Sequence, residues 1–307
     1  MSAEPFLALV GPTASGKTEA GVQVAESLGA EVVSVDSMLV YRGMDIGTAK
    51  PTPAERLRVR HHLLDAADPS EAFSVARYQG LARDAVAEIR ERDRRVLLVG
   101  GSGLYFRAVV DDLEFPGTDP DARRDLEAEV RALGAGEMYA RLAELDPVAA
   151  AKIAPDNVRR TVRALEVVAV TGRPFSSYAG AWERYPTGRV RAAGIDIARP
   201  VLSRRIEARV DAMLAAGVLD EVQALLHRGL FGSLTSSQAI GYAEFARHLR
   251  GELSLQEAVA GTVKRTKALA RRQQAWFRRD PRIRWFATGE RGAEAVVDDV
   301  TEYLRDG

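Results

Sequence analysis

The chain has 307 residues, its 43 basic residues balance its 43 acidic ones, and it contains no cysteine. This composition excludes disulfides and thiolate metal sites, and without a net charge any contact with nucleic acid must come from local patches. An acidic start and the lack of a long apolar run predict neither a signal peptide nor a membrane span, so we expect a cytoplasmic protein without membrane contact.

The first predicted strand, residues 6–10, leads into a glycine-rich loop and then into a helix over residues 17–28. The loop reads Gly11-Pro12-Thr13-Ala14-Ser15-Gly16-Lys17-Thr18. Glycines let backbone N–H groups converge on anionic oxygens, and the helix that follows adds its positive N-terminal end. Lys17 can bridge phosphates and the Thr18 hydroxyl can hold Mg²⁺. The loop therefore predicts a phosphate or diphosphate site, with Mg²⁺ as cofactor.

The next two predicted strands differ in how they end. The first of them ends at Asp36, at the edge of the sheet where open α/β folds bind their ligands. From position alone Asp36 is a catalytic residue, a helix cap or a residue that contacts the ligands of a metal ion. A helix over residues 74–92 then leads into a strand over residues 96–99, which runs into glycines. ATP and GTP hydrolases hold Mg²⁺ with an acidic residue on such a strand, and here that acid is missing.

Strands that alternate with helices predict a parallel sheet flanked by helices, an α/β fold of the P-loop NTPase type. Residues 117–186 are charged and helical without a convincing strand, and they predict an inserted all-helical subdomain within a core of residues 1–116 and 187–307. The core resumes with a strand over residues 190–197 and a helical run over 201–227, which Gly217 interrupts. A capping box at Ser254 begins the final predicted helix, which extends to Arg279.

Two basic clusters are candidates for contact with nucleic acid. The second half of the last predicted helix carries Lys264, Arg265, Lys267, Arg271, Arg272, Arg278 and Arg279 around Trp276 and Phe277. The insertion carries Arg159, Arg160 and Arg163, with Arg123 near its start. Either cluster alone is explained as a solvated helix face with the aromatic residues packed inward. Together, basic surfaces on two subdomains could close over an RNA stem-loop.

His61 and His62 are adjacent in an extended segment, so their side chains point to opposite faces. They cannot easily share one metal ion, and we expect buried hydrogen bonds instead.

Several longer motifs extend this pattern over nearly the whole chain. They are the loop 11–18, residues 35–51 (VDSMLVYRGMDIGTAKP), 61–65, 99–105, Arg160 with residues 163–166, 238–242 and 271–277. In these motifs the chain resembles the bacterial tRNA dimethylallyltransferases, also called tRNA isopentenyltransferases. The block 35–51 is the most specific of them, because many unrelated proteins share the loop.

The resemblance implies transfer of a dimethylallyl group from dimethylallyl diphosphate to N6 of adenine 37, next to the anticodon of tRNA. It implies that Asp36 accepts the N6 proton, that Lys17, Thr18 and the loop hold the diphosphate and Mg²⁺, and that Arg205 is a further diphosphate partner. The adjacent Arg204 leaves this choice of arginine open.

The same resemblance implies a tRNA path along the chain. Its residues are Asp36, Ser37, Met38, Leu39, Ser102, Arg123, Arg159, Arg160, Thr161, Val162, Arg163, Arg271, Arg272, Gln273 and Trp276. Ser102 stands where threonine is common in the family, and Met38 where a small residue is frequent. Serine keeps the hydroxyl, whereas Met38 could change how tightly a flipped base fits. We expect a monomer.

Three other functions remain open from the sequence. One is a P-loop kinase for a nucleotide or small metabolite, with Asp36 as base and the insertion as a lid. Another is prenyl transfer to a free adenine nucleotide, against which the insertion and the basic helix argue. The third is a non-catalytic RNA-binding module, which would not need Lys17 and Thr18.

Overall fold

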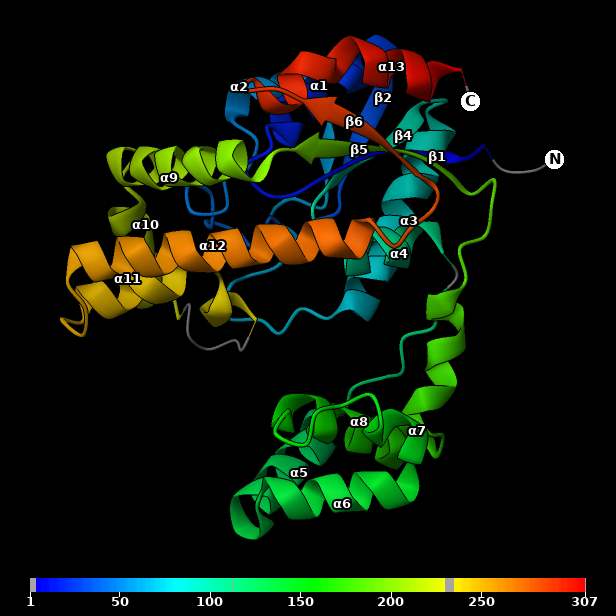
Figure 1. Cartoon of the computed structure of the whole chain (residues 1–307), viewed down its shortest axis with the longest axis vertical. Helices are drawn as coiled ribbons and strands as arrows, with labels where there is room; N and C mark the ends of the chain where they lie inside the picture. Colours follow the sequence, from blue (N-terminus) through cyan, green and yellow to red (C-terminus); the bar gives the residue numbers. More distant parts are fainter. Residues whose placement is uncertain (1–3, 112, 230–234, 307) are drawn as a thin grey trace. The chain divides into compact units, whose positions relative to one another are not determined.

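The computed structural model describes residues 4–111, 113–229 and 235–306 of the chain (Figure 1). The chain divides into two compact units. The core unit comprises Met1–Asp111 and Pro186–Gly307, and the insertion unit comprises Asp112–Tyr185. The boundaries expected from the sequence, at residues 116 and 187, lie close to these.

The core unit contains one parallel six-stranded sheet with the order β3-β2-β4-β1-β5-β6. Its strands are β1 (Phe6–Val10), β2 (Ala30–Ser34), β3 (His61–His62), β4 (Arg95–Gly100), β5 (Val190–Ile197) and β6 (Ile283–Thr288). The predicted α/β class with a parallel sheet is therefore confirmed. The strands are rich in valine, leucine and isoleucine because both faces of such a sheet are covered.

Helices cover both faces of the sheet, with α1 and α13 on one face and α3 and α4 on the other (Figure 1). The helices of the core unit are α1 (Lys17–Leu28), α2 (Pro53–Arg58), α3 (Val75–Glu91), α4 (Gly103–Val110), α9 (Arg199–Ala215), α10 (Val218–His227), α11 (Tyr242–Leu249), α12 (Leu255–Phe277) and α13 (Val297–Arg305). Short 3-10 segments are η3 (Ser236–Gln238) and η4 (Gly292–Val296). Among the described residues no helix is both long and apolar enough to cross a membrane.

Several predicted elements match the structure closely. The helix over residues 17–28 and the strands over 6–10 and 190–197 have the predicted bounds, and Gly217 separates α9 from α10 with a positive φ of 90°. Ser254 and Glu257 form the predicted capping box of α12. The prediction that this is the final helix was wrong, since β6 and α13 follow it. Helix α13 has only nine residues, so its apolar pattern is too short to be recognised in the sequence. Its apolar face is buried against α1 and β5.

The insertion unit is helical throughout its described residues. It consists of α5 (Pro120–Leu133), α6 (Ala135–Leu145), α7 (Pro147–Ala150), α8 (Val158–Thr171) and the 3-10 segment η1 (Phe175–Glu183). Leu126, Met138, Leu142 and Leu165 lie in its own hydrophobic core. The unit thus has a core separate from that of the sheet.

A buried ionic cluster holds the two points at which the chain leaves and re-enters the core unit. Arg282 donates to Asp111 (2.7 Å) at the end of α4, to Asp280 (2.7 Å), and to the carbonyl of Pro186 (3.4 Å). Arg107 also pairs with Asp111. The side chains of these four charged residues are at most 5% exposed. Although burial alone would lower it, the hydrogen bonds to Asp280 and Asp111 raise the pKa of Arg282.

We expect Arg282→Met to lower the free energy of unfolding by about 3–5 kcal/mol, because it leaves the buried Asp280 without its cationic partner and Asp111 with Arg107 alone. Urea unfolding followed by circular dichroism measures this loss. The exposed neighbour Arg279 is the matched control, and Arg279→Met should stay within about 0.5 kcal/mol of the wild type. A loss below about 1 kcal/mol for Arg282→Met, as for an exposed ion pair, would contradict the expectation.

Candidate active site

The phosphate loop joins β1 to α1 as predicted, and two residues with positive φ shape it. Ala14 has a φ of 62° and Gly16, the N-cap of α1, has a φ of 86°. The loop is packed from both sides: a Cβ on Gly11 would lie 3.0 Å from Ile195, and the N–H of Ala293 donates to the carbonyl of Ser15 at 2.9 Å. The strand-turn-helix context that the sequence motif requires is therefore present.

Lys17 lies in the first turn of α1, with its ammonium 3.0 Å from the carbonyl of Pro12. Burial lowers the pKa of Lys17 to about 8; the charge of Asp36 opposes this shift and that of Arg209 adds to it. Lys17 thus stands between a carboxylate and a second cation. An anionic ligand at the loop would remove the cost of holding its positive charge away from water.

Helix α9 supplies two arginines to the loop from positions one turn apart. Nε of Arg205 donates to the carbonyl of Ala14 (2.9 Å), and a Cβ on Gly16 would lie 3.1 Å from its Nη2. Arg204 instead pairs with the exposed Glu290 at 2.7 Å, so Arg205 is the one of these two adjacent arginines that contacts the loop. Arg209 donates to Thr13 Oγ1 at 3.1 Å.

Arg209 is a site residue that the sequence analysis missed. Its second contact is to the carbonyl of Thr48 (2.9 Å), and it has no carboxylate partner in the described part of the chain. Burial lowers its pKa from the usual value, and the charge of Asp36 opposes this. Its position four residues after Arg205 on a helix that faces the loop is the signal that could have found it.

Asp36 follows β2 at the carboxyl edge of the sheet, as expected. Its Oδ1 accepts the N–H of Met38 at 2.9 Å, and no helix begins there, so Asp36 is not a helix cap. Asp36 lines one cavity with Thr13, Lys17, Thr18 and Arg209. The predicted base and the predicted phosphate site are therefore next to each other.

A second cavity, of about 370 Å³, opens beside this one and shares some of its residues. Its polar lining residues include Asp36, Ser37 and Arg209, and its apolar lining residues include Met38, Ile206, Val210, Met213, Ile240 and Leu269. Arg272 and Gln273 also line it, whereas Leu39 lines the cavity at the loop.

Gln273 holds α12 to the phosphate loop. Its Oε1 accepts the N–H of Thr13 at 2.8 Å, and a Cβ on Gly101 would lie 2.5 Å from its Nε2. Trp276 packs against the first turn of α4, since a Cβ on Gly103 would lie 1.8 Å from its Cδ1. These contacts place α12 next to Ser102, whose side chain does not cap α4.

The basic half of α12 is only partly exposed to a ligand. Lys267 pairs with Glu207 (2.6 Å), Arg278 with Asp196 (2.6 Å) and Arg265 with Glu244. Arg271 and Arg272 are exposed. Phe277 packs inward, whereas Trp276 is 40% exposed, so the aromatic pair does not behave as one buried face.

In the insertion unit the predicted contact residues have different roles. Arg123 (2.5 Å) and Arg163 (2.9 Å) both pair with the fully buried Glu166. Arg163 also donates to the carbonyls of Pro116 and Gly117. Although burial alone would raise it, the hydrogen bonds from both arginines lower the pKa of Glu166.

The side chains of Thr161 and Val162 are buried, which argues against their predicted contact with a ligand at the surface. Val162 belongs to the hydrophobic core of the insertion unit. Arg159 and Arg160 are exposed and remain candidates.

The two histidines form hydrogen bonds, in keeping with the expectation. Nδ1 of His61 is 2.8 Å from the carbonyl of Val59, and Nε2 of His62 is 2.7 Å from Glu31. Among the described residues no group of three or more histidine or acidic side chains is arranged to hold a metal ion.

Comparison with known proteins places the chain in a family. A family model described as IPP transferase matches residues 39–280. A tRNA dimethylallyltransferase of Streptomyces coelicolor is 53% identical over 92% of this chain and 90% of its own, and one of a Nocardioides species is 52% identical over 99% and 97%. The solved full-length tRNA isopentenylpyrophosphate transferase of Bacillus halodurans superposes with a TM-score of 0.69 at 41% identity, covering 99% of this chain and 97% of its own.

A eukaryotic dimethylallyltransferase solved while acting on tRNA gives a TM-score of 0.77 at 24% identity over 93% of this chain and 74% of its own, a likeness of fold. Fold and site together define a P-loop-like α/β protein with an inserted helical unit. The chain belongs to the IPP transferase family.

We expect the affinity for inorganic pyrophosphate to fall as the pH rises through about 8, because Lys17 then loses its proton and its charge. The loss should be about tenfold between about pH 7.5 and about pH 9.5. Titration calorimetry measures it, with Lys17→Arg as the control that keeps the charge. Since pyrophosphate itself titrates, the ratio of the two affinities is the quantity to follow, and a ratio that is flat with pH would contradict the expectation.

Proposed function

We propose that this chain transfers a dimethylallyl group from dimethylallyl diphosphate to N6 of adenine 37, next to the anticodon of tRNA, and forms N6-(dimethylallyl)adenosine. The observation that carries the proposal is the single cavity lined by the phosphate loop, Lys17, Asp36 and Arg209. It brings a group that binds a leaving diphosphate next to a carboxylate that can accept a proton. The names of the relatives support the same reaction.

The diphosphate is the leaving group of this reaction, and the chain stabilises its charge. Negative charge develops on the diphosphate as the allylic carbon–oxygen bond breaks. The groups around this position are the loop N–H groups and the cations Lys17, Arg205 and Arg209. Burial lowers the pKa of two of these cations, Lys17 and Arg209. Bound diphosphate supplies the negative charge that they lack.

Mg²⁺ is the cofactor that fits these residues. Thr18 offers one hydroxyl ligand, and the described residues provide no carboxylate cluster for a metal. Such a donor set suits Mg²⁺, which keeps several waters and is held mostly by phosphate oxygens. When bound, Mg²⁺ neutralises part of the charge on the diphosphate.

Asp36 is the base for the amine. N6 of the adenine forms a bond to the allylic carbon, the bond from that carbon to the diphosphate oxygen breaks, and the N6 proton passes to the Asp36 carboxylate. The hydrogen bond from Met38 orients this carboxylate. Only a modest base is needed because the attacked carbon is already electron-poor.

The apolar residues that line the neighbouring cavity suit a five-carbon chain better than a polar acceptor. Side chains such as Ile206, Val210 and Leu269 lie within the same cavity of about 370 Å³ as Asp36. They would exclude water from the allylic carbon while the bond to diphosphate breaks.

The acceptor is a base that must leave the stack of the anticodon loop, at a cost of a few kcal/mol. Contacts between basic side chains and RNA phosphates offset such a cost. Exposed candidates are Arg271 and Arg272 in the core unit and Arg159 and Arg160 in the insertion unit. We propose that the enzyme acts in the cytoplasm as a monomer.

The end of β4 argues against an ordinary P-loop kinase. A Cβ on Gly100 would lie 2.4 Å from the carbonyl oxygen of Val35, so no carboxylate side chain fits there. Kinases and NTPases with this loop usually hold Mg²⁺ with such a residue. The close packing of β4 against the end of β2 therefore leaves no room at Gly100 for the acidic residue that kinases use.

With Mg²⁺, unmodified tRNA and labelled dimethylallyl diphosphate, we expect Asp36→Asn to lower the turnover on tRNA by about 10²–10⁴-fold, because the amide cannot accept the proton. Pyrophosphate affinity of the variant should stay within about threefold of the wild type, since Asp36 is not a phosphate ligand. Exposed Asp298 on α13 provides the matched control Asp298→Asn.

Parallel reactions offer AMP as acceptor or labelled ATP as donor. Label on AMP alone would move the acceptor to a free nucleotide, and phosphate transfer from ATP without prenyl transfer would identify a kinase. RNA binding and biological output unchanged in Lys17→Ala would favour a non-catalytic RNA-binding module.

We expect Thr18→Val to raise the Mg²⁺ concentration needed for half-maximal turnover by about tenfold, because valine keeps the shape and removes the ligand oxygen. The Mg²⁺ dependence of turnover measures this shift, and chelation should abolish turnover in both proteins. An unchanged Mg²⁺ dependence would remove Thr18 from the metal site.

A further inference from the structure

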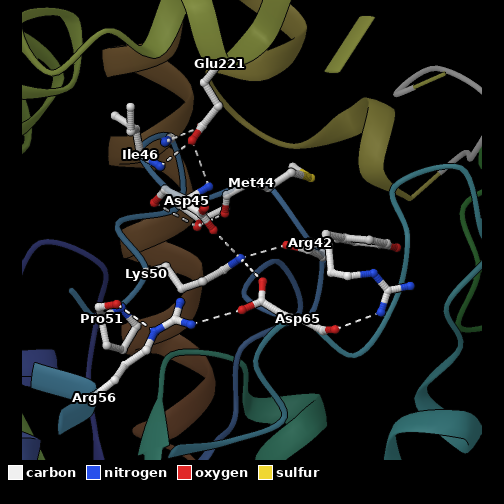
Figure 2. A network of polar contacts seen from close by, with 12 residues as sticks. Arg42, Met44, Asp45, Ile46, Lys50, Pro51, Arg56, Asp65 and Glu221 are labelled. Carbon is white, nitrogen blue, oxygen red and sulfur yellow. Dashed lines mark hydrogen bonds and ion pairs between the residues drawn. The ribbon is translucent and has the colours of Figure 1, made fainter. Parts of the chain in front are cut away.

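The carboxylate of Glu221 on α10 holds the loop formed by residues 44–51, here called the anchored loop (Figure 2). It accepts the backbone N–H groups of three consecutive residues: Asp45 (3.0 Å), Ile46 (2.8 Å) and Gly47 (3.1 Å). Successive N–H groups that converge in this way form a site for an anion. In this protein a side chain of the same molecule supplies the anion.

Tyr242 on α11 completes this contact. Its hydroxyl donates to Glu221 at 2.6 Å, and its ring lies so close to the anchored loop that a Cβ on Gly47 would be 2.5 Å from it. Burial raises the pKa of Tyr242, so its hydroxyl stays protonated and remains a donor. Glu221 therefore has four donors at one carboxylate.

Lys50 fixes the other side of the anchored loop (Figure 2). Its side chain is 1% exposed, and its ammonium donates to Asp45 (2.6 Å), Asp65 (2.7 Å) and the carbonyl of Tyr41 (2.7 Å). Arg56 adds a contact to Asp65 at 3.0 Å. Because this buried ammonium needs all three acceptors, it restricts the backbone conformation of this part of the anchored loop.

The anchored loop reaches the active site through Thr48. The carbonyl of Thr48 accepts Nη2 of Arg209, and Nη1 of the same guanidinium donates to Thr13 in the phosphate loop. With no carboxylate partner among the described residues, Arg209 takes its orientation from these two neutral acceptors. A shift of the anchored loop would move one of them.

We propose that Glu221 is a positioning residue for diphosphate binding: it holds the anchored loop so that the Thr48 carbonyl directs Arg209 to the phosphate loop. This inference rests on the proposed function, because it takes a diphosphate as the ligand. Glu221 itself acts from α10 through the loop, and Arg209 is the group that meets the ligand.

The test is a double-mutant cycle in the full-length protein, with Mg²⁺ and inorganic pyrophosphate as the probe in titration calorimetry. Glu221→Gln replaces one acceptor oxygen with an NH₂ group that faces N–H donors, and it should weaken pyrophosphate binding by about tenfold. In an Arg209→Gln background the same change should have no further effect, because the group through which Glu221 acts is gone.

Asp220→Asn is the matched control, since it removes the same charge from the adjacent, exposed position of α10. Its affinity should stay within about twofold of the wild type. Wild-type affinity in Glu221→Gln, or effects of Glu221→Gln and Arg209→Gln that add in the double variant, would overturn the inference while leaving the proposed function intact. A wild-type protein that binds no pyrophosphate would overturn the diphosphate site and this inference with it.

Should Glu221→Gln not yield folded protein, Tyr242→Phe tests the same link with a smaller change. It keeps the ring against Gly47 and removes one of the four donors to Glu221. We expect a loss in pyrophosphate affinity of about threefold that disappears in the Arg209→Gln background. An unchanged affinity would overturn the inference.

Discussion

Positive charge gathered at the carboxyl edge of the sheet is the constraint on which the rest of this structure depends. Lys17 and Arg209 lie half-buried beside the phosphate loop, and Arg209 has no carboxylate partner within the described residues. Partial burial of two neighbouring cations costs free energy, and an anionic ligand offsets that cost. A diphosphate, which carries several negative charges, is a ligand of this kind. Asp36, the one carboxylate whose charge supports both cations, is also the proposed base.

The block 35–51 combines two roles that the sequence shows only as one motif. Its first part carries Asp36 and Met38 into the site, and its last part is fixed by Glu221 and by Lys50. Loops usually tolerate change because few contacts hold them. This one has little freedom, since backbone N–H groups, a buried ammonium and a glycine in close contact with Tyr242 all depend on the same path.

The insertion unit has its own hydrophobic core, and some of its basic residues stabilise that unit. Glu166 lies fully buried and binds Arg123 and Arg163, so two of the arginines expected to contact tRNA first neutralise a carboxylate. Arg159 and Arg160 lie on α8, the helix of Arg163, and are exposed. The face of the helix on which a basic residue lies therefore decides whether it pairs with a buried carboxylate or stays exposed.

The sequence by itself determined the phosphate loop, Asp36 at the end of its strand, the parallel α/β core with a helical insertion, and the family, because glycine placement, hydrophobic period and motif spacing are local properties. Only the tertiary structure decided which arginine meets the loop. Arg205 and Arg204 are neighbours in the chain, and the direction of α9 turns one to Ala14 and the other to Glu290. It also brought in Arg209, Glu221 and Gln273, whose partners in the phosphate loop and the anchored loop are 161 to 260 residues away. Such contacts depend on how distant elements pack, and no local pattern in the sequence contains that information.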